Sequence, residues 1–179
     1  MRRLAVAALA LIGAAAAQNA GAQAPGGAAD PSTPVLRVDG WMRSVAQTGT
    51  TYYQCQQAAC EPGAVVSVRR QDAKTFTPGS HEALMRARQR SIMERYGPSA
   101  RITIGRTQIE RDDRGVIAGS VPEDIEGVAG LPPAWTNGFV SSPCAAFTIG
   151  SSASARAPAD RNFKTFQREL ARSARCGDI

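Results

Sequence analysis

Residues 50–70 read TTYYQCQQAACEPGAVVSVRR, and this stretch decides the fold. Its first part, Thr50–Gln56, is rich in the β-branched and aromatic residues that favour a strand. A Glu-Pro-Gly turn follows, and Ala64–Arg70 predicts the returning strand of a hairpin. Because side chains alternate along a strand, each strand has one face that favours burial. These faces consist of Thr51, Tyr53 and Cys55 on the first strand and of Ala64, Val66 and Val68 on the second.

Four cysteines occur in the chain, and two of them flank the turn of this hairpin. Four cysteines allow three pairings, and an even number in an exported chain is typical of disulfides. Cys55 and Cys60 are near enough in sequence to clip the hairpin end, which leaves Cys144 and Cys176 for each other. No Cys-x-x-Cys unit is present, and the chain has a single histidine, so no zinc site is expected. No other metal or cofactor is predicted.

Two helices are predicted, at Ser80–Tyr96 and at about Ala157–Arg175. Ser80 is expected to cap the first helix, and the Gly-Pro pair after Tyr96 is expected to end it. Each helix has apolar residues that recur on one face, as expected for packing against a sheet. These stripes consist of Met85, Ile92 and Tyr96, with Leu84 and Met93 beside them, in the first helix and of Phe163, Phe166, Leu170 and Ala174 in the second.

Short strands before and between the helices complete the pattern. Acids, prolines and glycines predict a loop over Pro122–Pro133, and a bulge is expected near Gly105. The order of strands, helix, strands and helix predicts an α+β fold. We expect an antiparallel sheet built from hairpins, covered by two amphipathic helices and held by two disulfides. The further predicted strands are Val35–Val38, Ala100–Arg111, Val116–Val121, Trp135–Val140 and Ala145–Ile149.

The amino terminus has the features of a secretory signal peptide. Two arginines and an uncharged, mostly apolar run precede small residues at cleavage spacing, which predicts a signal peptide over residues 1–22. The apolar run is too short to span a membrane comfortably. Residues 23–34, rich in Gly, Pro and Ala, are expected to form a flexible leader, and residues 35–179 a single domain. We therefore expect a periplasmic or secreted protein with no transmembrane anchor after processing.

His81 is the only histidine, so a histidine-dependent hydrolase would have to use it. Its place at a helix start predicts an exposed first-turn residue rather than a general base. No Gly-x-Ser-x-Gly motif marks a serine nucleophile. The acids Glu123, Asp124 and Glu126 are interpreted as solvated turn residues. No catalytic residue is therefore predicted.

Arginine dominates the cations, since only two lysines occur. A guanidinium group suits carboxylate and phosphate partners, and several arginines in the middle of the chain are candidates for an anion-binding surface. The alternative is that they lie on solvated faces with no ligand. Few aromatics and no phosphate-binding glycine loop accompany them, so no specific nucleic-acid binding is expected. The candidate surface consists of Arg69, Arg70, Arg86, Arg90 and Arg95.

These observations favour a non-catalytic interaction domain of the cell envelope, with an envelope protein or an anionic surface as its partner. The alternative is a small envelope hydrolase that uses His81 with a serine or an acidic residue. A screen against ester, peptide and glycan substrates separates the two. Turnover that is lost in His81→Ala, with the fold intact, would favour the enzyme.

We predict that protein recovered from its native compartment lacks residues 1–22. Removal of this segment takes away two arginines and lowers the formal net charge from +6 to +4. Intact-mass spectrometry of the exported protein measures the loss directly. Recovery of the full-length chain from the cytoplasm would contradict the prediction, and would remove the reason for expecting disulfides in cells.

Overall fold

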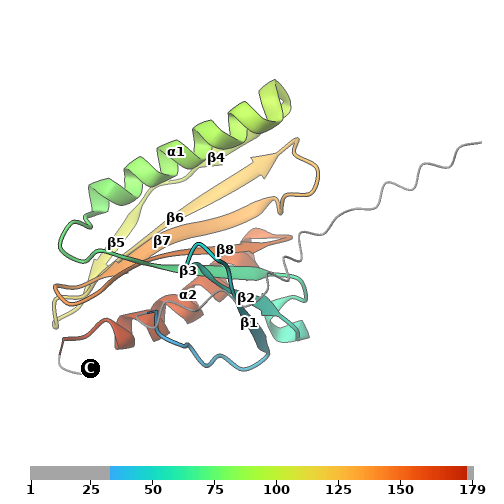
Figure 1. Cartoon of the computed structure of the whole chain (residues 1–179). Helices are drawn as coiled ribbons and strands as arrows, with labels where there is room; N and C mark the ends of the chain where they lie inside the picture. Colours follow the sequence, from blue (N-terminus) through green and yellow to red (C-terminus); the bar gives the residue numbers. More distant parts are fainter. Residues whose placement is uncertain (1–32, 177–179) are drawn as a thin grey trace, which may run out of the picture.

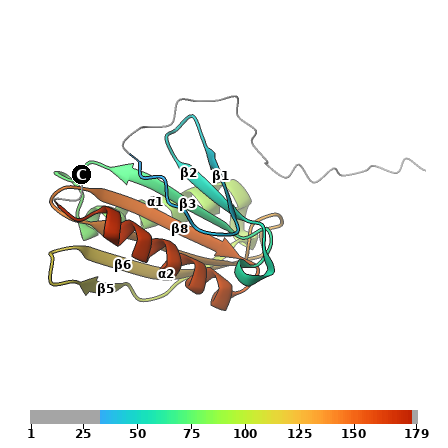
Figure 2. The same cartoon turned by 90° about the horizontal axis from the view of Figure 1, so that it is seen from below.

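The computed structural model describes residues 33–176, so the predicted signal peptide and most of the predicted leader lie outside the described part of the chain. Eight strands form one antiparallel sheet in the order β1-β2-β3-β8-β7-β6-β4, with β5 also paired to β6. Two helices, α1 (Pro78–Tyr96) and α2 (Arg156–Ser173), lie on opposite faces of the sheet (Figures 1 and 2). The predicted α+β class, antiparallel sheet, two helices and two disulfides are confirmed.

Consecutive strands pair along most of the sheet, and one long-range pairing joins its two parts. β3 pairs with β8 over seven residues of each strand, which connects the first hairpins to the last ones. Two short 3-10 helices, Ala58–Cys60 and Gly97–Ser99, lie outside the sheet. The strands are β1 (Trp41–Val45), β2 (Thr51–Cys55), β3 (Val65–Gln71), β4 (Arg101–Ile104), β5 (Gln108–Arg111), β6 (Ile117–Glu126), β7 (Ala134–Ser141) and β8 (Ala146–Ala153).

The hairpin predicted from residues 50–70 is present as β2 and β3, with Tyr53 opposite Val66. The faces predicted to be buried are buried on both strands. β1 was not predicted as a strand, and it forms the edge of the sheet beside β2. The strand predicted at Val35–Val38 is wrong, because this segment is irregular. Its Leu36 amide donates to the Tyr53 hydroxyl at 3.1 Å, a side-chain partner instead of a neighbouring strand.

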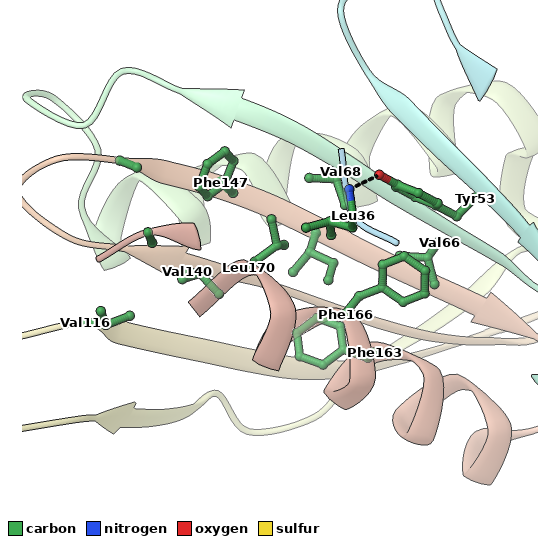
Figure 3. Close-up of a cluster of buried hydrophobic side chains, with 13 residues drawn as sticks. Leu36, Tyr53, Val66, Val68, Val116, Val140, Phe147, Phe163, Phe166 and Leu170 are labelled. Atoms are coloured by element: carbon green, nitrogen blue, oxygen red, sulfur yellow. Dashed lines mark hydrogen bonds between the residues drawn. The ribbon is translucent and has the colours of Figure 1, made fainter. Parts of the chain in front are cut away.

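The main apolar core lies between the sheet and α2 (Figure 3). The stripe predicted for this helix is buried, since Phe163, Phe166 and Leu170 are at most 1% exposed. Phe166 contacts the rings of Trp41 and Tyr53, with centroid distances of 5.0 and 4.9 Å. The sheet contributes aliphatic and aromatic side chains of alternate residues on its central strands: Val66, Val68, Val140, Phe147 and Ile149. Burial of these large side chains is the main source of stability in the fold.

The first helix begins two residues before its predicted start. Thr77 is its N-cap, and Pro78 occupies the first helical position, where a fixed φ and a missing N–H are favourable. The prediction that Ser80 caps the helix is therefore wrong. Ser80 instead completes a capping box, because its amide donates to Thr77 Oγ1 at 3.1 Å and its hydroxyl accepts from the Thr77 amide at 2.8 Å. The predicted end at Gly97 is confirmed, with a φ of 71° that glycine adopts readily.

The predicted apolar stripe of α1 is only partly buried. Met85 and Ile92 are buried, and Tyr96 is half-buried. Leu84 and Met93 remain 48% and 40% exposed. α1 thus presents two kinds of surface to solvent, charged groups on its outer side and single apolar side chains along its flanks.

The loop predicted over Pro122–Pro133 is wrong in its first half, because β6 continues to Glu126. Pro122 is tolerated within this strand because it lies opposite the break between β4 and β5, where the ladder is interrupted. Its carbonyl accepts from the Gly105 amide at 2.8 Å. The single strand predicted at Ala100–Arg111, with a bulge near Gly105, is instead two strands separated by this break. Residues of β6 alternate between buried and exposed up to its end, which places Glu123 on an inward-facing position.

Both predicted disulfides are formed. Cys55–Cys60 lies at the end of the β2–β3 hairpin, and the Cys60 carbonyl also accepts from Asn162 Nδ2 on α2 at 2.8 Å. Cys144–Cys176 joins the start of β8 to the segment that follows α2. Ser142 Oγ donates to the Ala174 carbonyl at 2.6 Å beside it, so a hydrogen bond supports the same junction. Cys144–Cys176 therefore strengthens a contact that a hydrogen bond also makes, whereas Cys55–Cys60 closes the hairpin end beside α2.

We predict that the double variant Cys144→Ser/Cys176→Ser loses more stability than Cys55→Ser/Cys60→Ser. Cys144–Cys176 closes a ring with a sequence separation of 32 residues, and Cys55–Cys60 closes a ring with a separation of 5. In the chain-entropy picture the long ring contributes about 3–4 kcal/mol, and the short ring much less. Urea unfolding followed by the fluorescence of the two tryptophans measures both losses. An equal or larger loss in Cys55→Ser/Cys60→Ser would contradict the prediction.

Candidate functional site

α1 covers only part of the sheet face on which it lies. Its inward side chains contact β6 and β7, where His81 packs beside Phe139 and Arg88 reaches Glu123. On the same side of the sheet, the side chains of β1 and β2 remain open to solvent, and Met42 and Tyr52 are 54% and 40% exposed. We call this uncovered part, formed by β1, β2, β3 and β8, the open face. The opposite side of the same strands packs against α2.

A pocket of about 350 Å³ lies where α1 meets the open face. Four α1 residues form its wall, and β3, β7 and β8 form its floor with side chains that are mostly polar. Arg69 and Arg88 line it, and no carboxylate does. We call it the helix–sheet pocket. Its lining residues are His81, Leu84, Met85 and Arg88 from α1, Ser67 and Arg69 from β3, Asn137 and Gly138 from β7, and Thr148, Ile149 and Gly150 from β8, together with Thr50.

A second pocket, of about 230 Å³, continues along the same flank of α1 and shares Arg88 with the first. Arg95 and the ring of Trp135 line it, and it too is lined by no carboxylate. Leu84, Arg88, Ser91 and Arg95 recur at helical spacing along this flank. We call the two pockets together the groove. Three arginines therefore border the groove, and none of its lining residues carries a negative charge.

Arg88, at the junction of the two pockets, is held from two sides. Its Nε donates to Glu123 Oε2 at 3.0 Å. Its guanidinium carbon lies 4.3 Å from the centroid of the Trp135 ring, a cation–π contact. About a third of its side chain is exposed, and its Nη2 is buried without a hydrogen-bond partner among residues 33–176. The guanidinium is thus fixed in orientation, and part of the Arg88 side chain remains exposed.

Glu123 is fully buried, which corrects its interpretation as a solvated turn residue. The correction follows from β6, which extends through this position and turns the side chain toward α1. Glu123 Oε2 also accepts from Asn137 Nδ2 at 2.8 Å, so the carboxylate has a charged and a neutral donor. Asp124 is exposed and forms an ion pair with Arg156 on the side of α2. Neighbouring residues of a strand point to opposite faces, so the two acids do not form one site.

His81 is also buried, and its predicted exposure in the first turn is wrong. His81 is the fourth residue of α1 and lies one turn before the buried Met85, so it faces the sheet, 5.2 Å from the Phe139 ring by centroids. Burial lowers its pKa below 6.5, and nearby Glu82 opposes this shift. The ring is therefore neutral at pH 7. Within residues 33–176 no hydrogen bond joins this ring to a serine hydroxyl or to a carboxylate.

The five arginines of the predicted surface do not form one surface. They are distributed over the groove, the rest of α1 and the side of β3 that faces α2. Arg69 lines the helix–sheet pocket, and Arg95 lines its neighbour. Arg86 and Arg90 lie elsewhere on α1, the former beside Glu82 and the latter in a hollow next to β4. Arg70 follows Val66 and Val68 on the side of β3 that faces α2.

Arg88 belongs to the arginine-rich middle of the chain but was not included in the predicted anion-binding surface, and the structure makes it the central residue of the candidate site. The sequence does indicate that Arg88 faces the sheet, because it lies seven residues after His81 and between Met85 and Ile92 on the inward face of the helix. A charged residue at such a position requires a buried partner. The partner, Glu123, is distant in sequence and was placed in a loop.

Other kinds of site have less structural basis. In the part of the chain that the structure describes, no three His, Cys, Asp or Glu side chains gather as ligands for a metal ion. All four cysteines are in disulfides. Neither described helix is long and apolar enough to cross a membrane.

We predict that Arg88→Met is strongly destabilising, whereas the double variant Arg88→Met/Glu123→Leu is much less so. The single change leaves the buried Glu123 carboxylate without its cation, and the expected loss is about 3 kcal/mol, the lower end for broken buried pairs because Arg88 is partly exposed. The double change replaces both charges by apolar groups. Urea unfolding of the two variants gives the comparison. A loss below about 1 kcal/mol for Arg88→Met would show that the pair does not hold α1 to the sheet.

Comparison with known proteins does not assign this site. No protein-family model matches the chain, and no curated protein matches it either.

Proposed function

We propose that this chain is an exported, non-catalytic interaction domain of the cell envelope that binds an anionic partner in the groove beside α1. Two disulfides in the described domain are compatible with an oxidising compartment outside the cytoplasm. The amino-terminal sequence supports cleavage of residues 1–22 and a periplasmic or secreted location.

The lining of the groove is the observation that carries the proposal. Arg69, Arg88 and Arg95 border it, and no Asp or Glu side chain lines either pocket. The acid that balances Arg88 lies behind it, fully buried at Glu123. A partner in the groove therefore meets cationic groups without a competing carboxylate. Such an arrangement favours ligands with carboxylate or phosphate groups.

The geometry supports binding more than catalysis. His81 lines the helix–sheet pocket, but its ring packs beside Phe139, and burial disfavours its protonated form. No free thiol is available, since every cysteine is in a disulfide. A rigid, pre-formed cationic groove needs no reacting group in order to hold a ligand. Ester, peptide or glycan turnover that is lost in His81→Ala would favour the hydrolase instead.

We predict salt-sensitive binding of poly-L-glutamate that depends on the arginines of the groove. Arg69→Gln/Arg95→Gln removes two exposed cations that line it, and we expect the affinity to fall at least about fivefold at low salt, since each charge-assisted contact is worth more than 1 kcal/mol. Arg86→Gln/Arg90→Gln is the matched control, with the same change of net charge outside the groove. Fluorescence anisotropy with labelled poly-L-glutamate measures both variants.

Binding should weaken as ionic strength rises through about 0.15 M, where charges more than about 8 Å apart are screened. An equal loss in the two double variants would show a diffuse charge effect and contradict the groove. The absence of binding at low salt would contradict the proposed function as a whole.

A further inference from the structure

We infer that the helix–sheet pocket recognises an acidic peptide segment of a partner protein, with a carboxylate against Arg69 and Arg88 and an aliphatic side chain against Leu84. The inference rests on the proposed function and names the chemistry of the partner. It concerns one of the two pockets, whereas the proposed function involves the whole groove.

The cationic part of the pocket is pre-organised. Arg88 is fixed by the Glu123 carboxylate and by the Trp135 ring, so little side-chain entropy is lost when a ligand binds it. Arg69 lies on β3 opposite Thr148 and is exposed. The pocket is lined by both arginines, one from the sheet and one from the helix wall. A carboxylate between them meets the fixed guanidinium of Arg88 on one side and the exposed guanidinium of Arg69 on the other.

The same pocket has an apolar wall. Leu84 lines it and is 48% exposed, and Met85 lies beside it, buried at the base of the wall. A single exposed leucine is common on protein surfaces and does not by itself indicate a binding site. Here it stands one helical turn from Arg88, in the lining of the same pocket. The occupant that fits this pair carries an apolar group close to an acidic group.

The floor of the pocket favours a peptide over an acidic oligosaccharide. Three of its polar side chains already donate hydrogen bonds within the protein, because Ser67 Oγ donates to the Gly150 carbonyl at 3.4 Å and Asn137 Nδ2 donates to Glu123. Thr148 donates to the Arg69 carbonyl at 3.4 Å and accepts from Gln71 Nε2 at 3.1 Å. A sugar with hydroxyls on every side would lose hydrogen bonds to water without finding replacements. No Trp, Tyr or Phe ring lines this pocket to stack on a sugar.

The size of the pocket sets the length of the contact. About 350 Å³ is at the lower end for small-ligand sites and accommodates two or three side chains rather than a domain. The open face continues beyond it toward β1 without a covering helix, so a longer chain can enter and leave along the sheet. A short linear segment therefore fits better than a buried small molecule.

The test uses three fluorescein-labelled pentapeptides and the exported protein with its disulfides intact. The sequences are Gly-Glu-Leu-Glu-Gly, its amide form Gly-Gln-Leu-Gln-Gly, and Gly-Glu-Gly-Glu-Gly. Anisotropy should show the first peptide binding at least about tenfold more tightly than the amide form, because a charge-assisted hydrogen bond is lost. It should also bind about three- to tenfold more tightly than the peptide without leucine, because apolar burial is lost.

Variants locate the contact. Arg69→Gln should weaken the first peptide about five- to tenfold, and Leu84→Ser should remove its advantage over Gly-Glu-Gly-Glu-Gly. Both residues are exposed, so neither change is expected to disturb the fold. Arg86→Gln is the control and should leave all three affinities within about twofold.

The outcomes separate the two proposals. Poly-L-glutamate binding in the groove together with equal affinities for the two acidic peptides would overturn the peptide inference and leave the proposed function intact. Displacement of poly-L-glutamate by polygalacturonate but by none of the peptides would overturn the inference in favour of an acidic polysaccharide. Loss of all anion binding would overturn both.

Discussion

The contact between α2 and one face of the sheet is the interaction on which the rest of the structure depends. Phe163, Phe166 and Leu170 cover the central strands, and this layer contains most of the large buried side chains. Because strand residues alternate between faces, concentration of the apolar residues on this side leaves the other side free to be polar. The β3–β8 pairing extends the same face under the first hairpin, so Tyr53 and Trp41 join the core. The main core and the proposed binding groove thus lie on opposite faces of one sheet.

α1 is attached to the polar face by few contacts, and the most specific of them is ionic. The Arg88–Glu123 pair, supported by Asn137 and Trp135, lies between the buried Met85 and Ile92 and adds an ionic contact to the apolar ones. A buried ion pair adds little net stability because both groups lose hydration, but it fixes the helix in one register. The result is a narrow helix contact with an open groove beside it. A helix with a continuous apolar face would have covered this part of the sheet.

The same arrangement explains why the groove is cationic. Glu123 is sealed beneath the helix, whereas Arg88 keeps part of its side chain at the surface, so the negative member of the pair is hidden and the positive member is presented. Arg69 and Arg95 add charge at the two ends without nearby acids in the lining. Arg88 is held in place before a ligand arrives, which suits recognition. The buried His81 forms part of the pocket wall and is neutral at pH 7, because burial lowers its pKa.

The local features of this protein were determined by its sequence, and the site was decided by its tertiary structure. Alternation in residues 50–70, the spacing of the four cysteines and the period of Phe163, Phe166 and Leu170 predicted the hairpin, the disulfides and the buried face of α2, because each depends on neighbours in the chain. The burial of Glu123 depends on the break between β4 and β5 that accommodates Pro122 within β6. The burial of His81 depends on the strand that α1 packs against, where Phe139 meets its ring, and the role of Arg88 depends on a partner 35 residues away. A charged residue shows its partner only when strand order brings the two together, so the groove became visible only in three dimensions.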